Sequence, residues 1–269
     1  MIVFVEPDSK WYDFVLMNRS HAPTIVVPLP FDSLVMSTTF TESFWEEQRS
    51  IDLEATVHRG TGVYKIWNEK LVMMMAATEL NPFKTKFFTW IDAGYYRNER
   101  IAPKFNETIV HLDITKAGVN PSKVLFLHVR NDSLRKATKG RVATAGNAFI
   151  GTAEALRELY KMYYLTLWDW ARKQYFIGSD QHIMAETCYR YSTVCHPWFP
   201  GNFKNWFAMS KLLKQREYNL SKASEHFYFE REPRLLLLPD PPRKPIKSFK
   251  EIQTKKSHLK LFNDWLSLL

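Results

Sequence analysis

An aspartate followed closely by a glycine ends the most apolar strand that the sequence predicts. Asp92 comes directly after the apolar run 87–91, and Gly94 stands two residues later. In open α/β sheets, ligands bind beyond the carboxyl ends of the strands. A carboxylate at this point can hold a ribose hydroxyl, or a divalent cation such as Mg²⁺ or Mn²⁺ that bridges a diphosphate. The alternative is an aspartate that only forms a turn, and the spacing favours neither interpretation.

A second carboxylate, Asp180, stands between an apolar run at 176–177, which we expect to be a strand, and a helical pattern. As a helix N-cap it would accept a backbone N–H and contribute about 1 kcal/mol. As a general base it would take a proton from an acceptor hydroxyl, with Gln181 and His182 beside it. The local sequence favours the cap, and the two roles compete for the same oxygen atoms.

Small residues at 146–151 offer a place where the backbone could approach a ligand closely. The segment lacks the G-x-G-x-x-G spacing of dinucleotide-binding loops and the lysine of a phosphate-binding P-loop, so both interpretations are excluded. The chain also lacks a Gly-x-Ser-x-Gly nucleophile elbow, which lowers the expectation of a hydrolase of that type.

The chain has two cysteines, Cys188 and Cys195, which are too few for a disulfide-built scaffold. They stand near His182 and His196, but the spacing fits no zinc motif. We therefore expect two free thiols.

The elements that must position these residues follow from the hydrophobic periodicity. The spacing of strand 2–5, helix 11–18 and strand 24–27 is typical of a βαβ unit with parallel strands. Further helices are predicted over 31–57, 66–80, 152–173, 180–191, 208–216 and 259–268, and further strands over 87–91, 124–129 and 235–238. The stretch after Cys195 is expected to be irregular. The predicted fold is α/β, a mixed and mostly parallel sheet flanked by helices over 1–238, followed by a basic linker and helix over 239–269.

The charge of the 269-residue chain is local. The 37 basic and 28 acidic residues give +9, and 45% of the residues are hydrophobic, which excludes a disordered chain. Residues 1–60 carry 4 − 9 = −5, the segment 130–141 carries 5 − 1 = +4, and the tail 239–269 carries 7 − 3 = +4. No nucleic-acid-binding motif accompanies these segments, which makes a nucleic-acid partner the least favoured interpretation.

A basic loop and a basic tail could instead neutralise a diphosphate, or contact an anionic membrane surface. No run of about eighteen uncharged residues predicts a membrane-spanning helix. The expectation is a soluble chain, cytoplasmic by default, or Golgi-lumenal or membrane-associated if an anchor precedes it.

Five blocks in order, at 64–70, 81–83, 90–97, 145–151 and 178–181, resemble the HtrL/YibB family over about residues 1–191. That family is associated with surface-polysaccharide gene clusters and looks like a relative of GT-A-type glycosyltransferases. The resemblance implies a nucleotide-diphosphate-sugar donor, a Mn²⁺ or Mg²⁺ ion and a hydroxyl acceptor on a glycan.

The resemblance also implies roles for particular residues. The donor-binding residues would be Trp67, Asn68, Lys70, Asp92, Gly94 and Arg97, with Asp92 as the metal ligand. The acceptor-side residues would be Gly146, Asn147 and His182, and the catalytic residues would be Asp180 and Gln181.

The sequence departs from this pattern in two ways. GT-A enzymes usually carry Asp-x-Asp at the metal strand, whereas Gly94 stands at the second acidic position, so the basic loop 130–141 could replace the cation. The family also has a further strand upstream of Met1. The sequence thus predicts a glycosyltransferase, with a non-catalytic glycan-binding module as the alternative.

Overall fold

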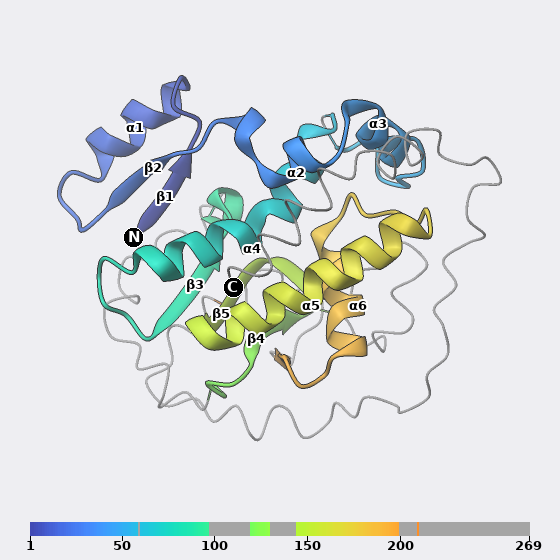
Figure 1. Ribbon diagram of the computed structural model, residues 1–269. Coiled ribbons are helices and arrows are strands. Elements are labelled where there is room, and N and C mark those ends of the chain that lie inside the picture. The colour runs from blue at the N-terminus through green and yellow to red at the C-terminus, as the bar shows by residue number, and fades with distance from the viewer. Residues whose placement is uncertain (59, 97–118, 130–143, 199–208, 210–269) are drawn as a thin grey trace. The chain divides into compact units, whose positions relative to one another are not determined.

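The computed structural model describes residues 1–58, 60–96, 119–129, 144–198 and 209 (Figure 1). They belong to two compact units, one from Met1 to Met73 and one that begins at Met74. Arg97, the basic loop 130–141, the predicted strand 235–238 and the tail 239–269 lie outside the described residues. Within the described ranges, no helix combines the length and the apolar character that crossing a membrane requires.

The first unit begins with the predicted βαβ arrangement. β1 (Ile2–Val5), α1 (Lys10–Asn18) and β2 (Ile25–Pro28) follow one another, and the two strands pair in parallel with Ile2 opposite Ile25. β-Branched residues fill both strands, and the helix provides the crossover that parallel pairing requires. The prediction for this segment is confirmed.

The predicted helix over 31–57 is broken into shorter pieces: η1 (Phe31–Ser33), α2 (Val35–Thr39) and α3 (Glu42–Ser50). The break before α3 has a local cause, because the Thr41 hydroxyl accepts the Phe44 N–H at 3.3 Å as an N-cap. The break before α2 has a distant cause, because the Glu69 carboxylate accepts the Val35 and Met36 N–H groups at 2.9 and 3.0 Å. Glu69 lies on α4 (Gly62–Leu80), which starts four residues before the predicted helix over 66–80.

The second unit contains a four-stranded sheet in the order β3-β5-β4-β6. Its strands are β3 (Phe87–Ile91), β4 (Val124–His128), β5 (Thr144–Thr152) and β6 (Cys195–Trp198). β5 is antiparallel to both of its neighbours, whereas β4 and β6 are parallel. The sheet is mixed, as predicted, but it is less parallel than expected, because β5 runs back between β3 and β4.

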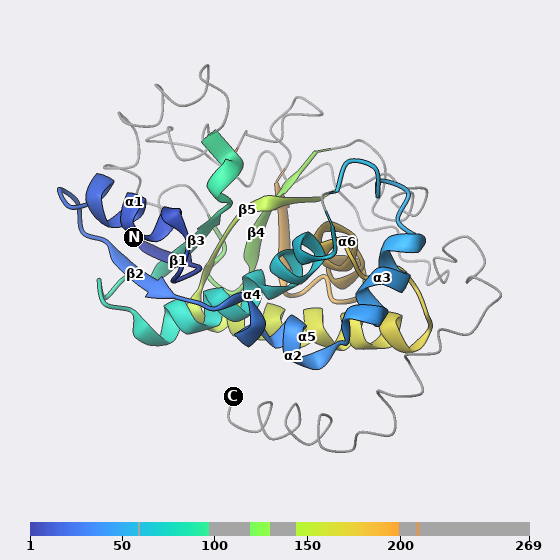
Figure 2. The same cartoon turned by 90° about the horizontal axis from the view of Figure 1, so that it is seen from above.

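Two helices accompany this sheet, α5 (Ala153–Arg172) and α6 (Asp180–Arg190) (Figure 2). They pack against each other, and both contact β5. Thr152 caps α5 as predicted, with its hydroxyl accepting the Ala155 N–H at 3.2 Å. The predicted apolar face of α5 is buried in the core and includes Leu156, Leu159, Tyr160, Tyr163, Tyr164 and Leu167.

The start of α6 differs from the prediction in two respects. The N-cap is Ser179, and Asp180 is the first helical residue, so the prediction of Asp180 as the cap is wrong. Residues 176–179 form no strand but an irregular connection from α5, which follows Gln174 in a left-handed backbone conformation (φ 61°). Asp180 therefore lies in the first turn of α6, one residue after the cap.

The described part of the stretch after Cys195 is strand β6, so the expectation of irregular structure is wrong there, whereas residues 199–208 and most of the predicted helix 208–216 lie outside the described residues. β6 is the last of the described strands in the sheet order, and a proline is tolerated there because no described strand pairs with its outer side. Residues 189–194 return the chain from α6 to this edge, and Cys188 and Cys195 form a disulfide with their Cα atoms 5.4 Å apart. The prediction of two free thiols is wrong, because excluding a zinc motif says nothing about which cysteines the fold brings together.

Candidate functional site

The carboxyl end of β3 and the first residues of β5 lie at the same end of the strands of the sheet. The register pairs Ile91 with Ala148, and the next backbone contact is the Asp92 N–H donating to the Asn147 carbonyl at 2.9 Å. β4 runs parallel to β3, and its His128 pairs with Thr144 at the same end. The structure thus places Asp92 beside Asn147, where α/β sheets bind ligands.

The Asp92 side chain is half-buried and held in a defined orientation. The Trp90 indole N–H donates to Oδ1 of Asp92 at 2.6 Å. The Tyr95 N–H donates to the Asp92 carbonyl at 2.8 Å, which closes the 3₁₀ turn η2 (Ala93–Tyr96). Asp92 therefore does form a turn, but its backbone does so, and the carboxylate is oriented separately. Among the described residues, no atom lies within 4 Å of a Cβ added to the exposed Gly94, so these residues leave the space beside the turn open.

The Asp180 carboxylate lies directly on the backbone of β5 at Gly146. Asp180 is 3% exposed, and a Cβ built on Gly146 would lie 2.4 Å from Oδ2 and 3.0 Å from Cγ of Asp180. Only glycine leaves room for this contact, which explains why the sequence has a glycine inside a strand. The structure therefore places Asp92 and Asp180 at adjacent residues of β5. Asp92 pairs with Asn147 through its backbone, and Asp180 contacts the side-chain position of Gly146, which lies on the opposite face of the strand.

Tyr163 adds a phenol to this group, and the sequence indicated only a core residue. Burial, and second the charge of Asp180, raise the pKa of Tyr163 well above its usual value. The phenol therefore stays neutral and keeps its proton. A tyrosine on the apolar face of a helix gives no local signal of such a neighbour, because Asp180 comes from another helix.

Gln181 and His182 are half-buried residues of the first turn of α6. The His182 ring packs edge-to-face on Phe176 at a centroid distance of 6.1 Å. Residues one or two positions apart on a helix point in different directions, so both side chains leave α6 at an angle to Asp180. The residue that contacts β5 through Gly146 is Asp180.

Three predicted donor-binding residues lie on the part of α4 that belongs to the first unit. Asn68 is fully buried, and its amide donates to the Tyr64 carbonyl at 2.9 Å. Lys70 is also buried, at 3% exposure, whereas Trp67 is half-buried. The Trp67 ring packs edge-to-face against His58 at 4.9 Å. Trp67 is thus the member of this set with the greatest access to a ligand.

The loop before α4 holds a polar cluster that the sequence did not indicate. Oδ2 of Asp52 accepts the Tyr64 hydroxyl and contacts Nδ1 of His58, both at 2.6 Å, and Oδ1 accepts the Glu54 N–H at 2.8 Å. Burial alone would raise the pKa of Asp52, but these hydrogen bonds outweigh it and lower the pKa. The carboxylate accepts hydrogen bonds from the loop and from Tyr64 on α4, so the cluster fastens the loop to the start of that helix.

The side chains near Asp92 decide what kind of cation site is possible here. In the described part of the chain, no three His, Cys, Asp or Glu side chains gather closely enough to hold a metal ion. Mg²⁺ is commonly bound through one or two carboxylates together with substrate phosphates, and Asp92 could supply one such ligand. The residues present therefore fit a cation held partly by the substrate, and do not form an all-protein cage.

Comparison with known proteins gives one family. A search of curated proteins and a search of solved structures each gave no match. The family model described as "Bacterial protein of unknown function (HtrL_YibB)" matches residues 1–214. That match covers most of the 269 residues, including both carboxylates at that end of the sheet. The chain belongs to the HtrL/YibB family.

Proposed function

We propose that the chain is a glycosyltransferase of GT-A-like fold, which moves a sugar from a nucleotide-diphosphate donor to a hydroxyl acceptor on a glycan. One observation carries the proposal: Asp92 and Asp180 meet β5 at the adjacent residues Asn147 and Gly146. Glycosyl transfer needs a group that binds the donor and a group that handles the acceptor proton. Two carboxylates from separate elements at one strand end match that need.

Asp92 is the donor-side group in this proposal. Its carboxylate is oriented by the Trp90 indole and lies beside the open space at Gly94. A bare carboxylate repels a diphosphate, so Asp92 acts on a ribose hydroxyl or as one ligand of a bridging Mn²⁺ or Mg²⁺. Asp92 would hold such a cation together with the substrate's phosphates, and the cation would supply positive charge for the leaving diphosphate.

Asp180 is the acceptor-side group. Its carboxylate accepts the proton of the acceptor hydroxyl as the oxygen attacks the anomeric carbon, or holds that hydroxyl in line. Its contact with Gly146 fixes the carboxylate against a rigid strand, and this limits its freedom to turn away. Positioning of this kind is worth much of a catalytic group's effect.

The test compares Asp92→Asn and Asp180→Asn with Glu154→Gln, which neutralises an exposed carboxylate on α5. Release of nucleotide is measured for the full chain with UDP-, GDP- and CMP-sugars, with and without Mn²⁺. Each aspartate variant should lose about 100-fold or more in turnover, whereas Glu154→Gln should keep the parent rate. Unchanged turnover in both aspartate variants would contradict the proposal.

A glycan-binding module remains the second candidate, because α1 presents aromatic side chains to solvent. Trp11 and Phe14 are 56% and 50% exposed and pack edge-to-face at 5.6 Å. Exposed aromatic rings can stack on sugar rings. This candidate predicts glycan binding that Trp11→Ala weakens and that nucleotide diphosphates do not change.

A further inference from the structure

A disulfide bond holds the C-terminal end of α6, the helix that begins with Asp180. Cys188 lies near the end of α6 and Cys195 begins β6, and both are almost fully buried, at 2% and 1% exposure. Their Cα separation of 5.4 Å lies within the range usual for disulfides, so the bond forms without backbone movement. The disulfide ties the end of α6 to the sheet through β6.

Within the described residues, β6 is paired along one side only, with β4. β6 stands at the end of the strand order, has four residues, and includes Pro197, which lacks an N–H. Beyond its pairing with β4, the Val124 N–H donates to the Val194 carbonyl at 2.9 Å, and Lys123 Nζ donates to the Ser192 carbonyl at 3.2 Å. Short edge strands with few backbone hydrogen bonds open at low free-energy cost.

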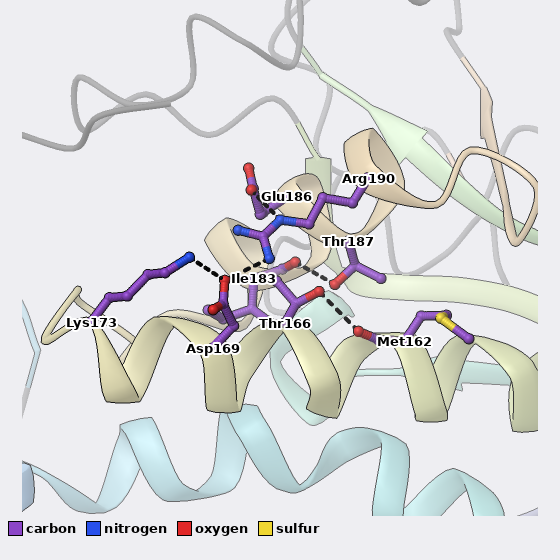
Figure 3. A network of polar contacts seen from close by, with 8 residues as sticks. All are labelled: Met162, Thr166, Asp169, Lys173, Ile183, Glu186, Thr187 and Arg190. Atoms are coloured by element: carbon purple, nitrogen blue, oxygen red, sulfur yellow. Dashed lines mark hydrogen bonds and ion pairs between the residues drawn. The ribbon is translucent and has the colours of Figure 1, made fainter. Parts of the chain in front are cut away.

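A charged clamp on α5 holds the same end of α6 (Figure 3). Arg190 donates to Asp169 at 2.7 Å and to Glu186 at 2.5 Å, and Lys173 donates to Asp169 at 2.9 Å. The Arg190 side chain is 27% exposed, so solvent and salt weaken the clamp. The disulfide is the component that salt leaves unchanged.

We propose that the Cys188–Cys195 disulfide is a redox latch that sets the position of α6, and that the chain works where protein thiols are oxidised. Its formation removes two electrons and two protons from the thiols, which pass by exchange to a disulfide oxidant such as oxidised glutathione, giving two glutathione thiols. Reduction reverses this exchange and frees β6 and the last turn of α6. α6 is a rod of 11 residues, about 16 Å long, so loosening one end disturbs the contact of Asp180 with Gly146 at the other.

The chain allows an unusually clear test because it has two cysteines in total. The full protein is equilibrated in glutathione buffers of defined ratio, and free thiols are titrated under denaturing conditions with alkylation. Oxidised protein should give zero free thiols and reduced protein two. Two thiols in a buffer rich in oxidised glutathione would overturn the proposal.

Hydrogen–deuterium exchange and thermal melts then compare the oxidised protein with protein reduced by a phosphine. Reduction should lower Tm by roughly 5–10 °C and speed exchange over residues 186–198, with the first half of α5 unchanged as the internal reference. The matched control is Cys188→Ser/Cys195→Ser, which the phosphine should not affect. Equal Tm and equal exchange in the oxidised and reduced wild-type protein would overturn the latch.

The link to Asp180 rests on the proposed function, and a third measurement separates the two. Reduction should lower kcat for nucleotide-sugar turnover at least fivefold with little change in KM, because a mispositioned group acts on the chemical step. Turnover that is unchanged while exchange over 186–198 rises would overturn the positioning of Asp180. Absence of turnover in the oxidised protein, with the exchange difference intact, would overturn the proposed function and leave the latch standing.

Discussion

The first turns of α5 and α6 look alike in sequence but are built for different tasks. Each begins with a hydroxyl residue, Thr152 or Ser179, followed by an acidic residue in the first turn. Thr152 closes its helix by accepting the Ala155 N–H at 3.2 Å and donating to the Pro121 carbonyl at 2.8 Å. Ser179 makes no side-chain cap bond, and its neighbour Asp180 is buried against β5. The residues at the N-terminus of α5 stabilise that helix, whereas the N-terminus of α6 places the Asp180 carboxylate against β5.

The largest expected effect on stability and on turnover is that of replacing Gly146, which contacts the start of α6. In Gly146→Ala, the new Cβ would lie 2.4 Å from Oδ2 of Asp180, so either the strand or the carboxylate must move. We expect a stability loss of about 1–3 kcal/mol and, through the displaced carboxylate, at least a 100-fold loss of nucleotide-sugar turnover. Urea unfolding and the nucleotide-release assay measure the two effects.

The control for stability is Gly94→Ala, because a Cβ there would meet no atom of the described residues within 4 Å. It should change the free energy of unfolding by less than about 0.5 kcal/mol. A Gly146→Ala protein as stable as Gly94→Ala would show that the strand yields easily, and would remove the steric argument for the position of Asp180.

The same comparison shows what the sequence could and could not predict. The cap at Thr152 and the bounds of β3 depend on neighbouring residues, and both predictions are confirmed. The contact between Gly146 and Asp180 depends on residues distant in the chain, and so does the capping of α2 by Glu69. The sequence indicated Gly146 and Asp180 as separate candidate residues, but no local pattern predicted that the two are in contact.

Two further predictions are wrong, each for its own reason. Residues 195–198 form strand β6, although proline usually argues against a strand, and an edge strand is the exception. The spacing of Cys188 and Cys195 excludes a zinc motif, but it does not show that the chain returns from α6 and brings the two thiols together.

The next prediction concerns the N-terminal residues of α5 and α6. Thr152→Ala removes both the cap of α5 and the hydrogen bond to Pro121, and should cost about 1–2 kcal/mol. Ser179→Ala removes no side-chain cap bond and should cost less than about 0.5 kcal/mol. Urea unfolding of the two variants side by side measures the difference. Equal losses would mean that Ser179 supports α6 after all, and the contrast between the two termini would disappear.

The smallest expected effect lies at the far ends of the two helices, where Asp169 on α5 contacts Arg190 on α6. Burial alone would raise the pKa of Asp169, but hydrogen bonds from Lys173 and Arg190 outweigh it and lower the pKa below 3.8. A lowered carboxylate pKa stabilises the fold above the unfolded-state value, and this contribution is lost as the pH falls through the folded-state value.

Asp169→Asn should therefore cost about 0.5–1 kcal/mol at pH 7 and progressively less below pH 3.8, as the pH falls towards the lowered folded-state pKa. Urea unfolding at pH 7 and at a pH below 3.8 measures this, with Asp8→Asn as an exposed control outside the helices that should show neither loss. A loss that is the same at both pH values would mean that the charge of Asp169 contributes nothing. The disulfide, rather than the charged clamp, would then be what holds the end of α6 opposite Asp180.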